Sequence, residues 1–257
     1  MKSRLDNELV KRALVSTRSQ AESYIKLGKV IVNGKAITKS GYFVDKNADI
    51  ELNQTEQYVS RAGLKLASVA KALSLNFKNK IILDVGSSTG GFTDYSLKHG
   101  AQKVIAVDVG TAQLHPSLRG NSSIELYEKT NILDINRWTL VDGGNKTSNF
   151  QKLSSNVDIV LIDVSFISLR QILPHICTLC TNQTQVVAMF KPQFETGNSL
   201  MHKGVIKNDS MRRAILRDFE VWVKNYFVIK DKTDSQITGA KGNLERFYLL
   251  KLLTKAQ

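Results

Sequence analysis

Three aspartates and one lysine lie where short apolar runs end, and these residue types at this spacing can carry chemistry. Asp84, Asp108 and Asp163 close three such runs, and Lys191 directly follows a fourth. Runs of this kind are typical of buried parallel strands, whose carboxyl ends meet at the ligand-binding edge of an α/β sheet. A lysine beside an aspartate at that edge can hold a reacting oxygen and manage its proton. The alternative is a solvated ion pair that contributes only about 0–1 kcal/mol.

The stretch after Asp84 predicts a cofactor site. Residues 86–91 are small or glycine and a helical pattern starts at Phe92, so backbone N–H groups at a helix start would face a ligand. Asp108 follows this turn by about 20 residues, which is the sequence separation expected of a carboxylate that accepts both hydroxyls of a ribose. A nicotinamide-binding turn would carry glycine at Ser88, and a carboxylate at position 84 suits a cationic ligand. S-adenosylmethionine (SAM) is therefore favoured over a nicotinamide cofactor, and an ordinary turn without a ligand is the remaining alternative.

A third strand is expected over residues 124–127, and the loop after it is expected to meet the adenine. The predicted cofactor-binding residues are Asp84, Gly86, Ser87, Ser88, Thr89, Gly90, Gly91, Phe92, Asp108, Val109 and Asn131.

The composition favours a basic globular protein that meets a polyanion. The chain has 257 residues, 42% of them hydrophobic, and a formal net charge of +13, which favours nucleic acid as a partner. No apolar run approaches the roughly 18 residues of a membrane span, and the charged start does not resemble a signal peptide, so a cytoplasmic protein without a membrane partner is expected. Cys177 and Cys180, even with His175, do not complete a zinc site, so no metal is predicted.

The first 55 residues predict a small α+β domain. Apolar residues recur at helical spacing in two short stretches, and Asn33-Gly34 between apolar runs is the strongest short hairpin signal. A linker is expected over residues 56–60, and a second domain over residues 61–257.

Motifs in this first domain support RNA binding. The segments R-L-D-x-x-L-V-x-R from Arg4, R-S-Q-A from Arg18 and I-x-x-G-x-V-x-V-N-G-K from Ile25 resemble the RNA-binding domain named after small-subunit ribosomal protein S-four. The resemblance implies that the basic helix pair grips folded RNA, whereas a solvated charged surface is the alternative. The candidate RNA-binding residues are Arg4, Arg12, Arg18, Ser19, Lys26, Lys29, Asn33 and Lys35, with Arg61 after the linker.

The second domain predicts a Rossmann-like α/β fold. Strand and helix patterns alternate from a helix expected over residues 61–75, which indicates a mostly parallel sheet with helices on both faces. The polar stretch 136–156 is expected to be a surface excursion, and 194–205 a loop. The last strands are expected over 226–230 and 247–253.

The second domain resembles the FtsJ-type RNA ribose 2′-O-methyltransferases, and the whole chain resembles the TlyA family of bacterial rRNA cytidine-2′-O-methyltransferases. The motifs are S-R-A-G-L-K-L (60–66), D-V-G-S-S-T-G-G-F-T-D (84–94), A-V-D-V-G (106–110), D-V-S-F-I-S-L (163–169), K-P-Q-F-E (191–195) and K-G-N-L-E (241–245). The resemblance implies a catalytic tetrad of Lys65, Asp163, Lys191 and Glu245. Ala62 stands where the family usually has glycine, and Ser87 stands where the family often has alanine.

This resemblance implies a SAM-dependent enzyme that methylates a ribose 2′-hydroxyl, with cytidine expected, in 16S or 23S rRNA or both, on ribosomal subunits. Lys191 would act either as a general base or as a charged stabiliser of the oxyanion. Three other functions are weighed against this one. They are a non-catalytic assembly factor, a membrane-active hemolysin-like protein and a small-molecule O-methyltransferase.

Overall fold

The structure is a computed structural model that describes residues 2–15, 17–53, 57–136, 151–152, 156–196, 205–206, 208–239 and 242–253. We call residues 2–53 the N-terminal unit and residues 57–253 the sheet unit. Most of the expected excursion 136–156 and of the expected loop 194–205 lies outside the described residues, as do residues 54–56. The boundaries expected near residues 55 and 60 therefore stay predictions.

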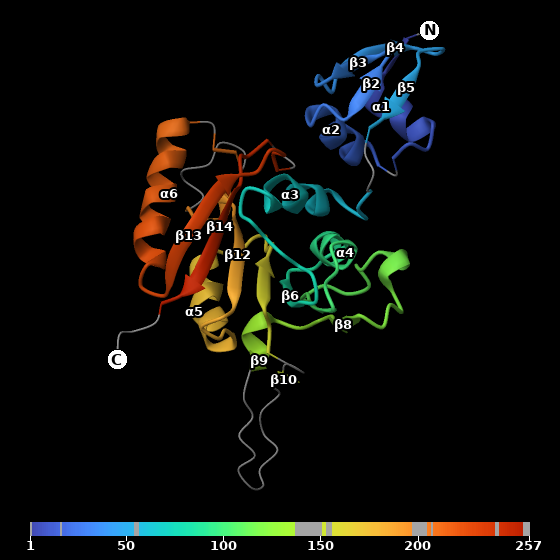
Figure 1. Cartoon of the computed structure of the whole chain (residues 1–257). Coiled ribbons are helices and arrows are strands. Elements are labelled where there is room, and N and C mark those ends of the chain that lie inside the picture. Colours follow the sequence, from blue (N-terminus) through green and yellow to red (C-terminus); the bar gives the residue numbers. More distant parts are fainter. Residues whose placement is uncertain are drawn as a thin grey trace, which may run out of the picture.

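The N-terminal unit packs two short helices against two small sheets (Figure 1). Helices α1 (Leu5–Lys11) and α2 (Arg18–Lys26) are followed by the expected hairpin of β2 (Val30–Val32) and β3 (Lys35–Ile37). Strand β5 (Ile50–Leu52) completes a three-stranded antiparallel sheet in the order β3-β2-β5. The turn at Asn33 and Gly34 has positive φ at both residues, which explains the choice of asparagine and glycine there.

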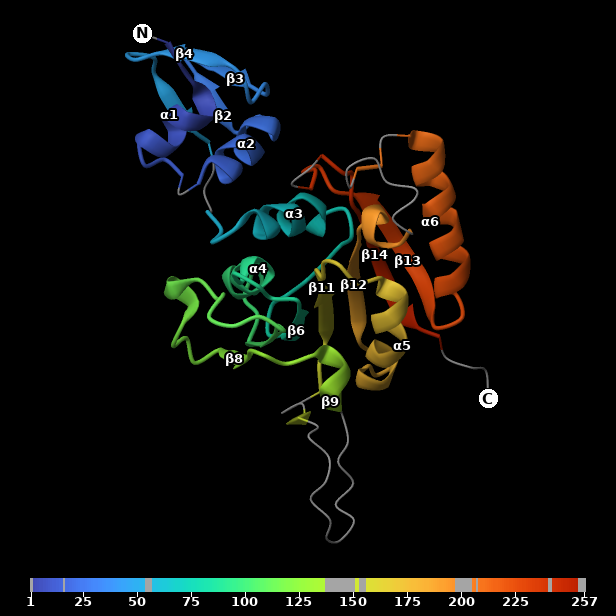
Figure 2. The ribbon, with the colours of Figure 1, turned by 180° about the vertical axis from the view of Figure 1, so that it is seen from behind.

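Two strands of this unit have no counterpart in the sequence-based expectations. Strand β1 (Lys2–Arg4) pairs antiparallel with β4 (Phe43–Asp45). Both strands are only three residues long, which is too short for an alternation of apolar and polar residues to be recognised in the sequence. Figures 1 and 2 show this ribbon at the end of the unit that is remote from the large sheet.

The sheet unit contains a seven-stranded sheet in the order β13-β14-β12-β11-β6-β7-β8. Five neighbouring strands are parallel, and β14 and β13 continue the sheet in antiparallel fashion, which confirms the predicted Rossmann-like fold. The strands are β6 (Ile81–Val85), β7 (Lys103–Val107), β8 (Ile124–Tyr127), β11 (Ile159–Ile162), β12 (Gln185–Phe190), β13 (Phe227–Asp234) and β14 (Arg246–Leu252). A separate parallel pair joins β9 (Ile135–Asn136) to β10 (Gln151–Lys152).

Helices cover both faces of this sheet (Figure 2). Helices α3 (Arg61–Ala70) and α4 (Gly91–Lys98) share one core with alternate strand residues such as Leu161 and Val187. Helices α5 (Leu169–Leu179) and α6 (Asp209–Val223) share the other core with the intervening residues such as Val160 and Val186. Each central strand is therefore apolar on both faces, which is why its sequence reads as a continuous apolar run.

Three short 3₁₀ helices connect these elements. They are η1 (Pro116–Leu118), η2 (Ile132–Asp134) and η3 (Pro192–Phe194). The last of them begins directly after Lys191, because Pro192 fixes the backbone for a helical turn at its first position.

Two element boundaries differ from the expectations. Helix α3 ends at Ala70 rather than near residue 75, and Ser74 in the following turn has a φ of 49°, which a helix cannot continue. Strand β13 runs to Asp234 rather than ending near residue 230, with an irregular register between Ile229 and Asp231. This strand is at the edge of the sheet, so its outer half carries polar residues that hide the strand pattern.

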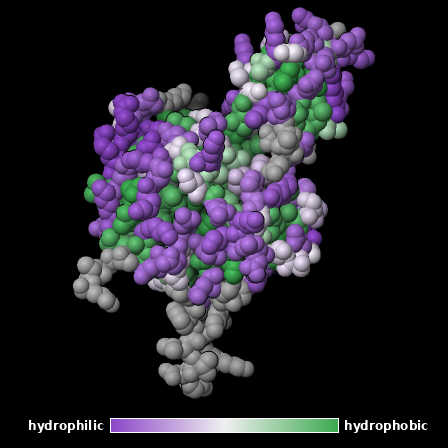
Figure 3. Space-filling view, viewed as in Figure 1, coloured by the Kyte–Doolittle hydropathy of each residue, from purple (hydrophilic) through white to green (hydrophobic). Residues whose placement is uncertain are grey.

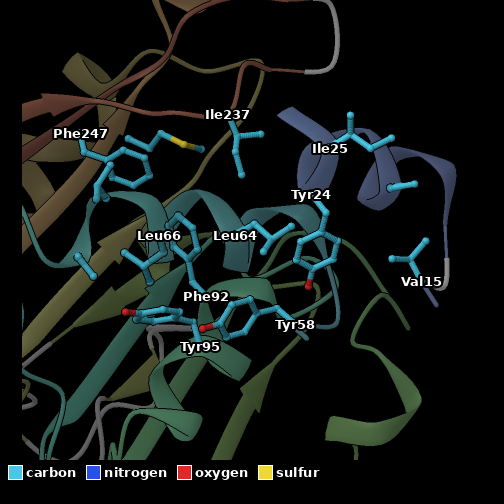
Figure 4. Close-up of a cluster of buried hydrophobic side chains, with 14 of the residues drawn as sticks. Val15, Tyr24, Ile25, Tyr58, Leu64, Leu66, Phe92, Tyr95, Ile237 and Phe247 are labelled. Carbon is cyan, nitrogen blue, oxygen red and sulfur yellow. The ribbon is translucent and has the colours of Figure 1, made fainter. Parts of the chain in front are cut away.

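The hydrophobic core continues from one unit into the other. Figure 4 shows Tyr24 of α2 beside Tyr58 and Leu64, and the same cluster includes Ile25 and reaches Phe247 of β14. Polar contacts follow the same junction, because Gln20 Nε2 donates to the Tyr58 carbonyl over 2.9 Å. No helix among the described residues is long and apolar enough to cross a membrane.

Candidate active site

The loop between β6 and α4 forms a tight cradle at the carboxyl edge of the sheet. Gly86 has a φ of 80°, and a Cβ there would lie 2.7 Å from the Asp163 carbonyl oxygen, so glycine alone lets β6 and β11 approach at this point. Gly90 has a φ of 87° and lies at the N-cap of α4. The helix start therefore points its unpaired backbone N–H groups into the space above the strand ends.

A cavity of about 330 Å³ opens beside this cradle. Asp108 at the end of β7 lies on its wall and accepts hydrogen bonds from the Ser88 and Gly110 backbone N–H groups, over 2.8 and 2.7 Å. Gln113 reaches across to Ser88, whose Oγ donates to Gln113 Oε1 over 3.0 Å. Of the predicted cofactor residues, the lining includes Gly86, Ser88, Asp108, Val109 and Asn131.

A second cavity of about 170 Å³ adjoins the first, and three of the four predicted catalytic residues line it. Lys65, Asp163 and Lys191 line it, together with the predicted cofactor residues Asp84, Gly86, Ser87, Ser88, Thr89 and Phe92. Gly90 and Gly91 line neither cavity; they form the backbone of the turn and the start of α4.

Two ion pairs organise the predicted tetrad. Lys191 Nζ lies 2.6 Å from Asp163 Oδ1 and donates to Ser165 Oγ over 2.8 Å. Lys65 Nζ donates to Glu245 Oε2 over 2.5 Å, and the two residues are 7% and 3% exposed. Glu245 does not line the cavity itself and reaches it through Lys65. The structure thus arranges the four residues as two cation–carboxylate pairs, and both lysines lie on the wall of the same cavity.

Close backbone contacts place the Lys65–Glu245 pair. Helices α3 and α4 meet at Gly63 and Gly91, where an added Cβ would lie 2.8–2.9 Å from the opposite backbone. Gly239 packs against Glu245 in the same way, because a Cβ there would lie 2.8 Å from Oε1. These glycines let α3 and the β13–β14 connection close around the buried pair.

Unpaired buried oxygens in the smaller cavity fit a cationic ligand. Asp84 is 1% exposed, and only its Oδ2 is hydrogen-bonded, accepting from Thr93 Oγ1 over 2.6 Å. Ser87 Oγ is buried and unpaired as well. Burial, helped by the nearby charges of Asp163 and Asp108, raises the pKa of Asp84 to about 7, although the Thr93 hydrogen bond opposes the rise. A cation there would relieve the cost of burying this carboxylate, so these residues fit the amino-acid end of SAM.

The loop after β11 holds residues that the sequence analysis did not single out. Ser165 accepts from Lys191, and Phe166 has a φ of 67° and is 92% exposed, with its ring 5.1 Å from that of Phe194. Glu195 ties this loop to η3, because it accepts from the Ser168 hydroxyl and the Leu169 backbone N–H. Their position in the sequence could have indicated them, since Ser165 and Phe166 come two and three residues after Asp163.

The predicted RNA-binding arginines are held by buried carboxylates in the N-terminal unit. Asp6 is fully buried and accepts hydrogen bonds from both Arg4 and Arg18. Glu8 pairs with Arg12, which also donates to the carbonyls of residues 46 and 48. Arg4 and Arg18 keep 38% and 53% of their side chains exposed, so their charges stay accessible.

Other predicted RNA-binding residues lie at the junction or on the hairpin. Arg61 Nη1 donates to Ser19 Oγ over 3.0 Å, and Lys26 Nζ donates to Thr238 Oγ1 over 3.3 Å. Lys65, four residues after Arg61 on α3, turns inward to Glu245. Lys29, Asn33 and Lys35 are exposed on and beside the β2–β3 hairpin.

Among the described residues, no cluster of three His, Cys, Asp or Glu side chains could hold a metal ion. No disulfide joins Cys177 and Cys180, and burial raises the pKa of Cys177 to about 11.

Comparison with known proteins defines the class. The FtsJ-like methyltransferase family model matches residues 58–252, and the S4 domain model matches residues 3–50. The chain therefore belongs to the FtsJ-like methyltransferase family and carries an S4 domain at its start, which confirms the resemblance seen in the sequence.

Individual relatives span almost the whole chain. One is named Hemolysin A, from Brachyspira hyodysenteriae, with 38% identity over 94% of this chain and 97% of the relative. Another is the 23S rRNA (cytidine-2′-O)-methyltransferase TlyA of Campylobacter jejuni, with 34% identity over 93% of this chain and 96% of the relative. A solved structure described as a candidate hemolysin of Streptococcus thermophilus has 34% identity and a TM-score of 0.68, covering 98% of this chain and 88% of the other.

Proposed function

We propose that this methyltransferase uses SAM to methylate the 2′-hydroxyl of a cytidine ribose in rRNA, acting on ribosomal subunits in the cytoplasm. The observation that supports this most strongly is the Lys191–Asp163 ion pair, 2.6 Å long, on the wall of a cavity that also offers an unpaired buried carboxylate oxygen of Asp84. The relative from Campylobacter jejuni named for this reaction supports the choice of substrate.

Each of the two cavities would bind a different part of SAM. Asp84 and Ser87 would hold the cationic amino-acid end, and Asp108 would accept the ribose hydroxyls of the adenosine. Val109 and Asn131 would flank the adenine. When bound, SAM supplies a methyl group that leaves the sulfonium without its bonding electrons and becomes bonded to the substrate oxygen.

Lys191 would stabilise the negative charge that develops on the attacking oxygen. A ribose hydroxyl is a weak acid, so its reaction needs a neighbouring cation to stabilise the oxygen as it loses its proton. Asp163 and Ser165 fix the Lys191 ammonium at the cavity wall. Because an ammonium cannot take up a further proton, the Asp163 carboxylate would accept the one that the hydroxyl releases. A second ammonium, that of Lys65, is held at the same cavity by Glu245 and adds to this field.

The S4 domain would bind the RNA that carries the target. Its exposed cations, Arg4, Arg18, Lys29 and Lys35, would contact phosphates and fix the register of the RNA rather than read its sequence. Phe166 follows Ser165, which contacts Lys191, and its exposed ring would stack on the base of the target nucleotide.

A single substitution tests this function. Lys191→Ala should reduce methyl transfer from labelled SAM to rRNA from a strain lacking the gene by at least about 10²–10³-fold. SAM affinity, measured by calorimetry, should change little. Lys80→Ala is the matched control, because Lys80 forms an exposed ion pair with Asp158 at the opposite end of β6. Full activity of the Lys191 variant would exclude the proposed mechanism, and a map of 2′-O-methyl marks on the rRNA identifies the nucleotide.

A further inference from the structure

The outer face of the β1–β4 ribbon combines a cation with an exposed aromatic ring. The register pairs Arg4 with Phe43 and Ser3 with Val44. Directly opposed residues of an antiparallel pair point to the same face, and neighbours alternate. Val44 is 2% exposed and faces the core, so Arg4 and Phe43 lie side by side on the outer face. Phe43 is 58% exposed there.

Asp6 joins a second guanidinium to that of Arg4. Its Oδ2 accepts from Arg4 Nη2 over 2.8 Å and from Arg18 Nε over 2.9 Å, so both guanidinium groups surround one carboxylate. Burial alone would raise the pKa of Asp6, but the hydrogen bonds and charges of the two arginines lower it to about 2. The carboxylate therefore stays ionised and holds both arginines in fixed positions at the surface.

We propose that this face binds one unpaired nucleotide of the RNA substrate, with its phosphate on Arg4 and Arg18 and its base stacked on Phe43. Two fixed guanidinium groups suit a phosphate, which they contact through paired N–H donors. A neighbouring exposed ring offers a stacking surface, the means by which proteins recognise nucleotides outside duplex RNA. We call this set of Arg4, Arg18 and Phe43, with Asp6 beneath it, the nucleotide site.

The charge around Phe43 favours RNA over an apolar partner. Arg4 is paired with Phe43 in the ribbon, and Lys2 follows on the same face opposite Asp45. Arg18 adds a further cation through the Asp6 carboxylate that it shares with Arg4. Hydrophilic side chains gather at this end of the N-terminal unit in Figure 3. A single aromatic ring among cations offers little apolar area to a protein, whereas it matches the alternating phosphates and bases of an RNA loop.

The position of the nucleotide site determines which kinetic constant should change when the site is removed. The ribbon lies at the end of the N-terminal unit remote from the sheet (Figures 1 and 2). The nucleotide held there is therefore distinct from the one that reacts at Lys191. Loss of Phe43 should raise the KM for rRNA and leave kcat unchanged. The site rests on the proposed function only in taking RNA as the substrate.

Two RNAs and the full-length protein test the proposal. Phe43→Ala should weaken binding to a stem–loop RNA about tenfold, because one stacked base is worth roughly 1–3 kcal/mol. Binding to a blunt duplex of the same stem should change by less than about twofold. Phe43→Tyr should bind both RNAs like the wild type. Val221→Ala, which truncates an exposed apolar side chain on α6, is the matched control.

Abasic loop nucleotides complete a double-mutant cycle. They should weaken stem–loop binding by the wild type as much as Phe43→Ala does, and should have no further effect on that variant. Equal weakening for stem–loop and duplex, or wild-type affinity of Phe43→Ala for both, would overturn the nucleotide site. Neither result would touch the proposed function, which stands or falls with methyl transfer by Lys191→Ala.

Discussion

Both units pair cationic side chains with a buried carboxylate, but the two arrangements differ in how far the cations are exposed. In the N-terminal unit, buried Asp6 holds Arg4 and Arg18 with their side chains 38% and 53% exposed. In the sheet unit, Lys65 and Glu245 hold each other with side chains 9% and 3% exposed. Salt screens exposed charges strongly and buried ones weakly. The first arrangement therefore suits capture of a polyanion, and the second suits control of charge at a reacting atom.

The largest effect should come from breaking the buried pair. Glu245→Gln leaves the nearly buried ammonium of Lys65 without its carboxylate. We expect a loss of roughly 3–5 kcal/mol in the free energy of unfolding and of about 10²–10³-fold in kcat. Denaturant unfolding and single-turnover methyl transfer measure the two effects. Glu51→Gln, at an exposed position of β5, serves as control, and normal activity of Glu245→Gln would remove that residue from the tetrad.

The salt dependence of each kinetic constant should separate the two units. If Arg4, Arg18, Lys29 and Lys35 each neutralise a phosphate, raising salt from about 50 to 200 mM should raise the KM for rRNA about 10²-fold. The value of kcat should change little over the same range, because the ion pairs of the tetrad are buried. A kcat that falls in parallel with RNA affinity would contradict this separation.

The same contrast explains how far the sequence could be interpreted. The apolar runs predicted the strands of the large sheet, and the strand ends located Asp84, Asp108, Asp163 and Lys191, since parallel strands place their carboxyl ends on one edge. These features depend on local pattern. The pairing of Lys65 with Glu245 depends on contact between positions 180 residues apart. The family resemblance assigned both residues to one tetrad, but the ion pair between them was not predicted.

Burial of charge was the feature least accessible from sequence. The sequence predicted Arg4, Arg12 and Arg18 as equivalent RNA contacts, because a carboxylate nearby in the chain does not indicate whether it is buried. In the structure, Asp6 and Glu8 lie within the fold, and their partners differ in exposure and in hydrogen bonds. The short β1–β4 ribbon was missed for a related reason, since three-residue strands carry too few positions to show a period.

Asp84 provides a test of burial without an ionic partner. Its pKa of about 7 lies above the ordinary value of 3.8, so the folded protein holds this proton more tightly than the unfolded chain does. Its burial therefore destabilises the SAM-free protein most above pH 7, and the penalty shrinks as the pH falls toward 4. Asp84→Asn should raise the Tm at pH 8 by at least about 2–4 °C, with a smaller gain at lower pH.

The same substitution should weaken SAM binding. A hydrogen bond to a charged group is worth roughly 1.5–3 kcal/mol, so the affinity at pH 8 should fall about 10–100-fold. Wild-type affinity should also fall as the pH drops below 7, because protonation removes the carboxylate charge. Thr93→Ser, which keeps the hydroxyl donor to Asp84, is the control. Tight SAM binding by Asp84→Asn would exclude this carboxylate as the partner of the cationic end.

The smallest effects should distinguish two arginines that the sequence treated alike. Arg18→Ala removes an exposed cation, so the slope of log affinity against log salt should become shallower by about 0.9. Arg12→Ala instead removes the ion pair with Glu8 and two hydrogen bonds to backbone carbonyls. We expect it to lower the Tm by a few degrees and to leave the salt slope unchanged. RNA titrations at several salt concentrations measure the slopes, and a loss of slope in Arg12→Ala equal to that in Arg18→Ala would show that both arginines contact phosphate despite their different partners.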